Sequence, residues 1–476
     1  MKYFPGIIYL AAGLTACLLL PPGLRGEPPL PAGLGSGPAE PALPSGLGGE
    51  PDLPPGLALP GEETFPAEPA AEPFTLPFRL SGFAEGLIGA RTQRDPYQKD
   101  LSAGEVRLRL EGEKGWDRAA LRVGADFLYD PVLDRHSIDL ESGRGWLDLR
   151  EARFSATPLS FFDLKAGRQI LTWGTGDLLF INDLFPKDWN SFFIGRDDEY
   201  LKAPADSAVI SLFTGPANLD LVYSPRFDPD RFIDGRRISY YNPALGTTAG
   251  RDAVVEADVP DRWFKDDEAA FRLYRNISGW EAALYGYRGY WKSPAGSDPV
   301  SGKATFPRLG VYGGSLRGVA AGGIGNLEFG FYDSEEDRSG SDPLVPNSEL
   351  RFLAGYEREL FPEFNVGVQY YLEYMLGYDN YRENLPPGIP ARDEARHVLS
   401  LRLTRLLFRQ NLILSFFGYW SPSDRDFYLR PKVSYRLDDH WTAALGANVF
   451  WGADDWTFFG QFRKNTNAYL SLRYGF

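Results

Sequence analysis

Short segments in which apolar and polar residues alternate run from Phe74 to the end of the chain, and they constrain the fold more than any other feature. Val106 and Leu108, for example, flank Arg107. A period of two is typical of β-strands, because successive side chains point to opposite faces of the sheet. The polar members include many charged residues, which a packed core rarely accepts. We therefore expect one face of the sheet to contact lipid and the other to contact water.

The junctions between these segments carry a second signal, because every second junction is tight. The tight junctions are expected at Glu113-Lys114-Gly115, Thr157-Pro158, Thr214-Gly215-Pro216, Ile277-Ser278, Ala321-Gly322-Gly323, Phe361-Pro362, Phe408-Arg409-Gln410 and Leu437-Asp438-Asp439. The junctions between them are mostly long, charged and rich in Pro and Gly. Short turns that alternate with long loops are typical of barrels that span an outer membrane.

About 18 strands fit the alternating pattern, each long enough to cross a bilayer at the usual tilt. They lie near residues 76–90, 104–112, 117–129, 145–156, 160–173, 205–213, 217–224, 269–275, 279–288, 307–320, 325–333, 349–359, 363–375, 395–407, 411–421, 425–436, 440–451 and 466–476. The sequence therefore predicts an all-β fold, a transmembrane antiparallel up-and-down β-barrel of about 16–18 strands over residues 74–476.

The composition excludes two other classes of protein. Only residues 7–20 form a sustained apolar run, which is too short and too close to the N-terminus for a bundle of membrane-spanning helices. The formal net charge of −14 gives the chain no basic footprint, so nucleic acid is not an expected partner. The single cysteine, Cys17, precedes the barrel, so neither disulfides nor thiolate metal sites are expected within it.

Residues 1–26 have the layout of a secretory signal peptide. Lys2 supplies positive charge, residues 7–16 form the apolar core, and small residues follow. Two kinds of processing remain open. Cleavage near Gly26 removes the whole segment, whereas Leu14-Thr15-Ala16-Cys17 resembles a lipobox, in which Cys17 becomes the acylated first residue of a lipoprotein.

Residues 27–73 repeat the phrase Glu-Pro-x-Leu-Pro-x-Gly-Leu three times and contain no Lys, Arg or His. The proline density opposes helix and sheet, and the uniform negative charge resists collapse, so we predict a Pro/Gly-rich acidic disordered tether. We expect it to serve as a periplasmic linker or to bind a periplasmic partner through its repeated leucines. Because no segment before Phe74 has strand periodicity, residues 1–73 are expected to be dispensable for the closed sheet.

The chain ends on an amphipathic strand, on which Leu470, Leu472, Tyr474 and Phe476 share one face. A terminal Phe on such a strand resembles the insertion signal that the outer-membrane assembly machinery reads. We therefore expect the chain in the outer membrane of a Gram-negative bacterium, with that machinery, lipid and lipopolysaccharide as partners. The long loops are expected outside the cell and the tether in the periplasm.

Residues 165–174, Lys-Ala-Gly-Arg-Gln-Ile-Leu-Thr-Trp-Gly, followed by Asp188 and Trp189, resemble the Gly-Arg-Gln strand and the next loop of alginate-export barrels and related proteobacterial porins. The residues that match the motif are Gly167, Arg168 and Gln169. The resemblance implies a monomer of about 18 strands. It also implies that an anionic polymer or small carboxylates pass through an arginine-rich lumen, to which Arg168 contributes.

The connection at residues 174–204 carries more large apolar residues, among them Phe180, Phe192 and Phe193, than an exposed loop tolerates. We expect it to fold into the barrel mouth and to narrow a channel. The alternative is that it packs on the outer rim or on a neighbouring subunit. The residues expected to line the constriction are Asp177, Lys187, Trp189, Arg196, Asp197 and Asp198.

Strand parity places two sets of charged residues on the inner face. A basic wall lies on strands that become neighbours when the last strand pairs with the first: Arg79, Arg107, Arg109, Arg122, Arg150, Arg430, Lys432, Arg436 and Arg473. An acidic wall faces it: Asp220, Glu281, Glu328, Glu357, Glu359 and Glu373. The basic wall is expected to attract anions within a Debye length of about 8 Å. The alternative is that these charges pair across neighbouring strands and keep the lumen wet.

Catalysis has little support in the sequence. His136, His397 and His440 lie on separate parts of the predicted barrel and cannot converge on one nucleophile. No cofactor or metal is expected. The predicted function is a channel for passive or substrate-selective passage of small polar, mainly anionic, solutes or acidic saccharides. Two alternatives remain: a scaffold or conduit barrel of a multi-protein envelope complex, and an outer-membrane hydrolase.

Overall fold

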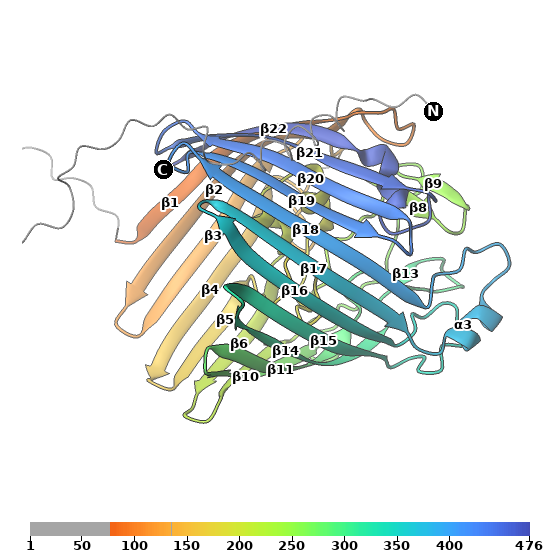
Figure 1. The fold of residues 1–476 in the computed structure, drawn as a ribbon, viewed down its shortest axis with the longest axis horizontal. Coiled ribbons are helices and arrows are strands. Elements are labelled where there is room, and N and C mark those ends of the chain that lie inside the picture. The colour runs from red at the N-terminus through yellow and green to blue at the C-terminus, as the bar shows by residue number, and fades with distance from the viewer. Residues whose placement is uncertain (1–76, 135) are drawn as a thin grey trace, which may run out of the picture. The chain divides into compact units, whose positions relative to one another are not determined.

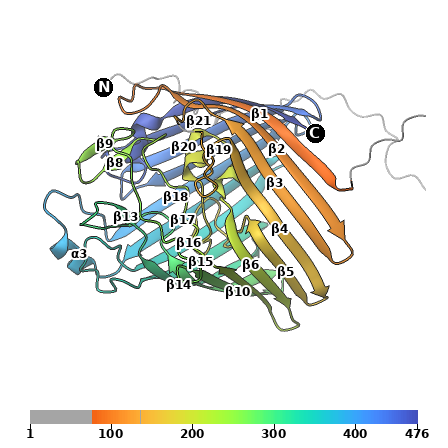
Figure 2. The same ribbon diagram turned by 180° about the vertical axis from the view of Figure 1, so that it is seen from behind.

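The computed structural model describes residues 77–134 and 136–476, so the predictions for the signal peptide, Cys17 and the tether lie outside the described residues. Eighteen long strands form one antiparallel sheet in this part of the chain (Figures 1 and 2). The last strand pairs with the first, with Glu85 opposite Arg473, so the sheet is closed. The predicted all-β barrel and its strand number are confirmed.

The barrel strands follow one another in chain order around the sheet. They are β1 (Arg79–Arg91), β2 (Leu101–Trp116), β3 (Ala119–Tyr129), β4 (Leu147–Leu159), β5 (Phe162–Gln169), β6 (Ala205–Phe213), β7 (Asn218–Ser224), β10 (Glu268–Ile277), β11 (Trp280–Tyr290), β14 (Arg308–Ala320), β15 (Gly323–Ser334), β16 (Glu349–Phe361), β17 (Phe364–Met375), β18 (Ala395–Leu407), β19 (Leu412–Ser421), β20 (Asp426–Arg436), β21 (Trp441–Gly452) and β22 (Asn467–Gly475).

The loops add short elements of their own. They are η2 (Asp198–Leu201), η3 (Gly460–Asn465), the helices α2 (Trp189–Ile194) and α3 (Tyr378–Asn384), and the small hairpins of β8 (Tyr240–Asn242) with β9 (Thr247–Ala249) and of β12 (Gly296–Ser297) with β13 (Ala304–Thr305). Among the described residues, no helix is long and apolar enough to cross a membrane.

Tight turns join every second pair of strands, and the other connections are long except for residues 422–425. Two predicted turns were misplaced. β2 continues to Trp116, because the segment at Glu113-Lys114-Gly115 still pairs with β3. β4 continues through Thr157-Pro158 to Leu159, because the ladder shifts register there and accommodates a proline that cannot donate a hydrogen bond.

The two-residue turn Ser278-Gly279 shows why these hairpins are tight. Both residues have positive φ, 51° and 84°, which is the backbone conformation of a type I′ turn. Such a turn matches the right-handed twist of the strands that it joins. The turn therefore fixes the register of β10 against β11.

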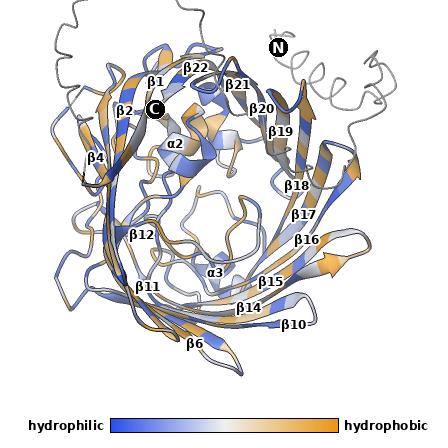
Figure 3. Cartoon of the chain, turned by 90° about the vertical axis from the view of Figure 1, so that its left-hand side faces the viewer, coloured by the Kyte–Doolittle hydropathy of each residue, from blue (hydrophilic) through white to orange (hydrophobic). Residues whose placement is uncertain are grey.

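The predicted alternation of faces is present in the structure. Val106 on β2 is 64% exposed, whereas its neighbour Arg107 is 4% exposed. Figure 3 shows the same alternation as changes of colour along the strands. Leu470, Leu472 and Phe476 are exposed, as large apolar residues on an outward face should be. Their role as an insertion signal, with Tyr474, remains a prediction.

The apolar core lies inside the ring of strands, where loop residues meet inward-facing aromatic residues. Ile181, Phe192 and Phe193 belong to one buried cluster together with Tyr428 of β20 and Phe450 of β21. Figure 3 shows α2, which carries the two phenylalanines, within the ring. A barrel wall and a loop thus share one core, and this core positions the functional residues.

Candidate functional site

The loop at residues 174–204 crosses the inside of the barrel. At one end its Asn182 amide donates to Glu328 of β15, with 2.9 Å between Nδ2 and Oε1. Further along, Asn467 of β22 donates from Nδ2 to the carbonyl oxygen of Phe193 at 3.1 Å. The structure therefore places this loop where the sequence predicted it, inside the barrel. Whether it narrows a conducting path is part of the function proposed below.

Glu328 fixes the start of this loop. Its carboxylate accepts hydrogen bonds from the backbone N–H of Thr175 at 2.8 Å and of Asn182 at 2.8 Å. Gly174 lies directly against it with a φ of 80°, and an added Cβ would come within 2.9 Å of Oε1. Glu328 is 2% exposed. It was predicted to line an acidic wall, but it is buried as an anchor because the loop covers it.

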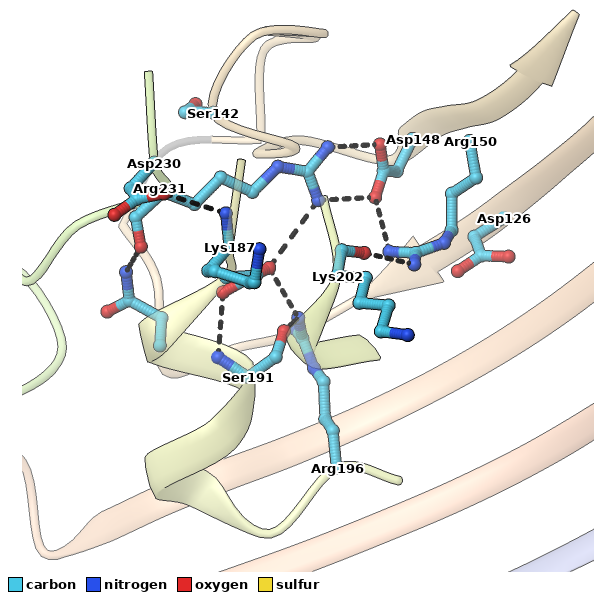
Figure 4. A network of polar contacts seen from close by, with 12 residues as sticks. Asp126, Ser142, Asp148, Arg150, Lys187, Ser191, Arg196, Lys202, Asp230 and Arg231 are labelled. Carbon is cyan, nitrogen blue, oxygen red and sulfur yellow. Dashed lines mark hydrogen bonds and ion pairs between the residues drawn. The ribbon is translucent and has the colours of Figure 1, made fainter. Parts of the chain in front are cut away.

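A buried network of ion pairs, which we call the latch, holds the loop on the side of β2 and β4. It consists of Glu105, Asp148, Asp188, Arg196 and Arg231. Figure 4 labels Asp148, Arg196 and Arg231 of this network. Arg196 donates from Nε to Glu105 Oε2 at 2.9 Å. Arg231 Nη2 lies 2.7 Å from Asp148 Oδ1, and its Nη1 lies 3.4 Å from Asp188 Oδ2. No side chain of the latch is more than 13% exposed.

The latch joins three parts of the chain. Asp188 caps α2 by accepting a hydrogen bond from the backbone N–H of Ser191 at 2.8 Å. Arg231 belongs to the loop at residues 225–267, so one guanidinium connects that loop both to α2 and to the barrel wall. Burial makes an unpaired charge costly, and here each charge has a partner. The network therefore fixes both loops against one wall.

Arginines of the predicted basic wall support the latch instead of facing open lumen. Arg107 Nη2 lies 3.1 Å from Glu105 Oε2, and Arg107 also pairs with Asp126. Arg109 Nη1 lies 3.0 Å from the same Asp126. Arg150 donates from Nη2 to the carbonyl oxygen of Lys202 at 2.7 Å. The prediction that these arginines line the pore was wrong, because loop residues cover them.

Beside the latch, on β20 and β22, the same loop makes looser contacts at a place we call the charged gap; β22 pairs with β1, which pairs with β2. Its residues are Asp197 and Glu199 of the loop, Lys432 of β20 and Arg473 of β22. Asp197 Oδ2 lies 3.6 Å from Lys432 Nζ, and Glu199 Oε1 lies 3.6 Å from Arg473 Nη2. Both distances exceed a normal hydrogen bond. The acids are 44% and 55% exposed and both cations 27%, so solvent reaches all four.

Two neighbours border the charged gap. Arg430 of β20 lies 2.8 Å from Asp198 Oδ1, and its guanidinium covers the ring of Phe192 at 4.1 Å. Burial alone would raise the pKa of Asp198, but Arg430 more than offsets it, and the pKa lies below its usual range. Burial raises the pKa of Glu199, and Arg473 offsets this only in part. Arg430 was predicted to line the pore, yet it is 9% exposed.

The residues predicted to line the constriction divide into two groups. Asp177, Asp197 and Asp198 are between 43% and 46% exposed, and Asp177 pairs with Arg402 of β18. Lys187 and Arg196 do not line a lumen. Lys187 is 3% exposed, and its ammonium donates to the carbonyl oxygen of Phe185 at 2.6 Å and to Asp183 Oδ1 at 3.0 Å.

Trp189, the sixth predicted residue, is partly buried. Its indole Nε1 donates to Asp230 Oδ2 at 3.0 Å, and its ring packs against Phe180, Phe192 and Phe193. These contacts place it on the side of the loop that faces the other long loops. Trp189 therefore lines a cavity among the long loops and does not line the charged gap.

The other residues of the predicted basic and acidic walls are mostly paired. This agrees with the alternative that these charges pair across neighbouring strands. Arg122 lies between Glu111 at 2.7 Å and Glu151 at 2.9 Å. Glu373 Oε2 lies 3.0 Å from Arg396. The other contacts are those of Asp220 with the Ser211 hydroxyl at 2.6 Å, of Glu281 with Arg272 at 2.6 Å, and of Glu359 with the Glu363 backbone N–H at 2.6 Å. The residues that are exposed near the tight turns are Arg79, Glu357 and Arg436.

The Gly-Arg-Gln motif has a structural role here. Arg168 donates from Nε to the carbonyl oxygen of Leu149 at 2.7 Å, and its Nη1 lies 3.1 Å from Asp206. Gln169 donates to the carbonyl oxygen of Ser207 at 3.1 Å. Gly167 has a φ of 119°, and an added Cβ would lie 2.2 Å from the carbonyl oxygen of Ala152. Arg168 is thus buried between strands and does not project into an open lumen.

Sequence reasoning missed two functional arginines for different reasons. Arg402 lies two residues from Ser400, which faces inward, on a strand that the sequence predicted. The alternation of faces along the strand could therefore have identified it as an inward-facing residue. Arg231 lies in a long loop, 83 residues from Asp148, and carries no periodic signal. A contact of that range depends on how the loop folds back into the barrel.

Neither a protein-family model nor a curated protein matches the sequence. Solved structures similar to this chain include OccAB3 of Acinetobacter baumannii, with 11% identity and a TM-score of 0.49 over 84% of this chain and 99% of that one. OccK3 (OpdO) of Pseudomonas aeruginosa has 12% identity and a TM-score of 0.48 over 83% and 95%. Salmonella typhi OmpF, in complex with daunomycin, has 8% identity and a TM-score of 0.41 over 84% and 97%.

Proposed function

We propose that the barrel is a passive channel of a Gram-negative outer membrane for small polar solutes, with a mild preference for anions. The observation that carries the proposal is the asymmetry of the loop at residues 174–204. The latch holds it against β2 and β4, whereas the charged gap on the nearby strands β20 and β22 remains accessible to solvent. A passage lined by exposed charges suits a hydrated solute better than an apolar one.

The preference for anions follows from where the cations are attached. Lys432 and Arg473 project from barrel strands, whose backbone is fixed by pairing on both sides. The acids of the charged gap project from a loop and the short helix η2. Arg473 is also held by Glu85 Oε2 at 2.7 Å, so its position does not depend on the loop. Arg79 and Arg436 extend the exposed positive charge toward the tight turns.

The other two functions have weaker support. The lumen of a conduit barrel is filled by a partner, whereas here the chain's own loops occupy part of it. A hydrolase needs convergent groups, yet His397 bonds to Tyr370 at 2.8 Å and His440 to the carbonyl oxygen of Gly475 at 2.9 Å, in separate places. Lipid, the assembly machinery and a periplasmic partner remain proposed partners, with the long loops outside the cell.

Reversal potentials across a planar bilayer with a salt gradient test this proposal. The unmodified channel is expected to favour anions mildly. The double variant Lys432→Gln with Arg473→Gln is expected to shift the potential toward cations, because it removes the fixed cations of the charged gap. Arg358→Gln is the matched control, since Arg358 is exposed at a position of outward parity on β16. A clear cation preference in the unmodified channel would reject the anion-selective assignment.

A further inference from the structure

A cavity of about 1010 Å³ lies among the long loops and is bordered by part of residues 174–204. This volume matches the upper range of pockets that hold small organic molecules. Its lining comes from the crossing loop, the loops at residues 230–256 and 291–304, the segment at residues 458–462, and inward-facing residues of β15 to β19. It is a different space from the charged gap, and none of the four gap residues lines it.

Many residues of the cavity lining are aromatic. The core cluster contains several apolar side chains that are only partly buried, and those of Phe180, Trp189, Tyr240 and Trp291 all line this cavity. Phe458, which is 44% exposed, also lines it. Apolar surface that folding leaves uncovered in a recess is typical of a ligand site.

Four of the five cations of the lining have carboxylate partners, and the fifth, Lys303, is exposed to solvent. Arg396 lies 2.6 Å from Asp424 and 3.0 Å from Glu373, so its charge is compensated. The other compensated cations are Arg351, which lies 2.7 Å from Glu349, Lys187, which lies 3.0 Å from Asp183, and Lys292, which lies 2.5 Å from Glu268. A charged ligand would gain little from these four cations, because each is already compensated, and solvent weakens its attraction to the exposed Lys303.

Two tyrosines of the wall hold the crossing loop through their hydroxyls. Tyr332 donates its hydroxyl to the carbonyl oxygen of Ile181 at 2.5 Å, and Tyr419 donates to that of Leu178 at 2.5 Å. These hydroxyls hold the crossing loop and are not free to bind a solute. Their rings are covered, that of Tyr332 by the Arg351 guanidinium at 3.9 Å and that of Tyr419 by stacking on Tyr428 and Phe459. The open stacking surface of the cavity therefore comes from the partly buried rings, such as Trp291 and Phe458.

We propose that this cavity is a binding site for an uncharged solute with a flat aromatic or fused-ring body. The volume, the uncovered aromatic surface and the pairing of four of the five lining cations favour this class over a small anion. The proposal goes beyond the channel function and does not depend on it, because binding in the cavity requires no conduction.

Riboflavin and its 5′-phosphate form a matched pair of ligands for a test. They share one planar fused-ring body, and only the second carries a strong negative charge. Flavin fluorescence is quenched by stacking on Trp or Tyr, so binding to the full-length barrel in nanodiscs can be titrated directly. Empty nanodiscs give the background. We expect saturable quenching, with riboflavin binding at least as tightly as its phosphate.

Two variants locate the site. Trp291→Leu and Phe458→Leu remove aromatic faces from the lining, and each is expected to weaken riboflavin binding about two- to tenfold. The matched controls are Trp263→Leu and Phe161→Leu, at residues that are 53% and 50% exposed and do not line the cavity. Heat-modifiable migration shows whether each variant folds. One folded cavity variant is sufficient to test whether riboflavin binds in the cavity.

Three results would overturn the proposal. The first is quenching no greater than with empty nanodiscs, which would show that the cavity does not hold a flat uncharged ring. The second is tighter binding of the phosphate than of riboflavin, which would indicate an anion site. The third is that every folded cavity variant binds like its control.

Discussion

The latch and the charged gap are built from the same kinds of residue, yet they have opposite properties. In the latch, Arg231 lies 2.7 Å from Asp148 and both side chains are under 5% exposed. In the charged gap, Lys432 lies 3.6 Å from Asp197, and the two are 27% and 44% exposed. The barrel wall is therefore joined to its loops through tight dry pairs at β2 and β4 and through loose wet pairs at the nearby strands β20 and β22.

The difference teaches that burial decides what a charge pair does in this lumen. A buried pair is costly to break, because removal of one partner leaves the other charge without solvent. An exposed pair contributes little stability, since water already solvates both charges. We infer that the latch fixes the position of the loop and that the charged gap interacts with solutes.

The largest effect is expected from breaking the latch. Arg231→Met leaves Asp148 and Asp188 buried without this partner, so we expect a loss of roughly 3–5 kcal/mol in the free energy of unfolding. Urea unfolding of the barrel in lipid vesicles measures it. The control is Arg236→Met, whose guanidinium is 40% exposed beside Asp234 and which should cost about 0–1 kcal/mol. Equal losses in the two variants would contradict the distinction between buried and exposed pairs.

The next effect is on conductance. Deletion of residues 178–194 removes α2 and the apolar part of the crossing loop, so single-channel conductance should rise clearly. Deletion of residues 379–384 is the control, because α3 has no buried residue and its removal should leave conductance unchanged. Unchanged conductance after the first deletion, in a barrel that still shows heat-modifiable migration, would mean that the loop does not restrict the path.

The smallest effect is expected from one acid of the charged gap. Asp197→Asn removes a half-exposed carboxylate and should shift the reversal potential slightly toward anions at low salt. In 1 M salt the Debye length falls to about 3 Å, so the shift should largely disappear. A shift that persisted at 1 M would indicate a change in loop position instead of a loss of exposed charge.

The sequence was sufficient for the architecture because the architecture is periodic. All eighteen strands were located, and the inward position of the apolar loop followed from residues such as Phe192 and Phe193. Errors arose where a local irregularity interrupts the period. At Arg150 the register of β4 shifts against Gly124 and Ala125, so Glu151 also lies on the inner side, where it pairs with Arg122.

The environment of the inward-facing charges was harder to predict. The alternation along a strand predicts on which face of the sheet a side chain lies, but it does not predict whether a loop covers that side chain. Arg107 and Lys432 have the same parity, but only Arg107 is covered by the crossing loop. That cover depends on contacts such as Glu105 with Arg196, which are 91 residues apart. A wall predicted as one continuous basic surface is therefore divided into a buried part and an exposed part.

Accessibility of single cysteines to a charged methanethiosulfonate reagent tests the central claim most directly. Cys17 is the only cysteine of the chain, so the unmodified protein supplies the background. Lys432→Cys samples the charged gap, and Ser191→Cys, an almost isosteric change at a residue that is 0% exposed, samples the latch. We predict stepwise changes of single-channel current for Lys432→Cys and none for Ser191→Cys. Equal reaction of both cysteines, or no reaction at Lys432→Cys, would contradict a loop that is sealed at the latch and open to solvent at the charged gap.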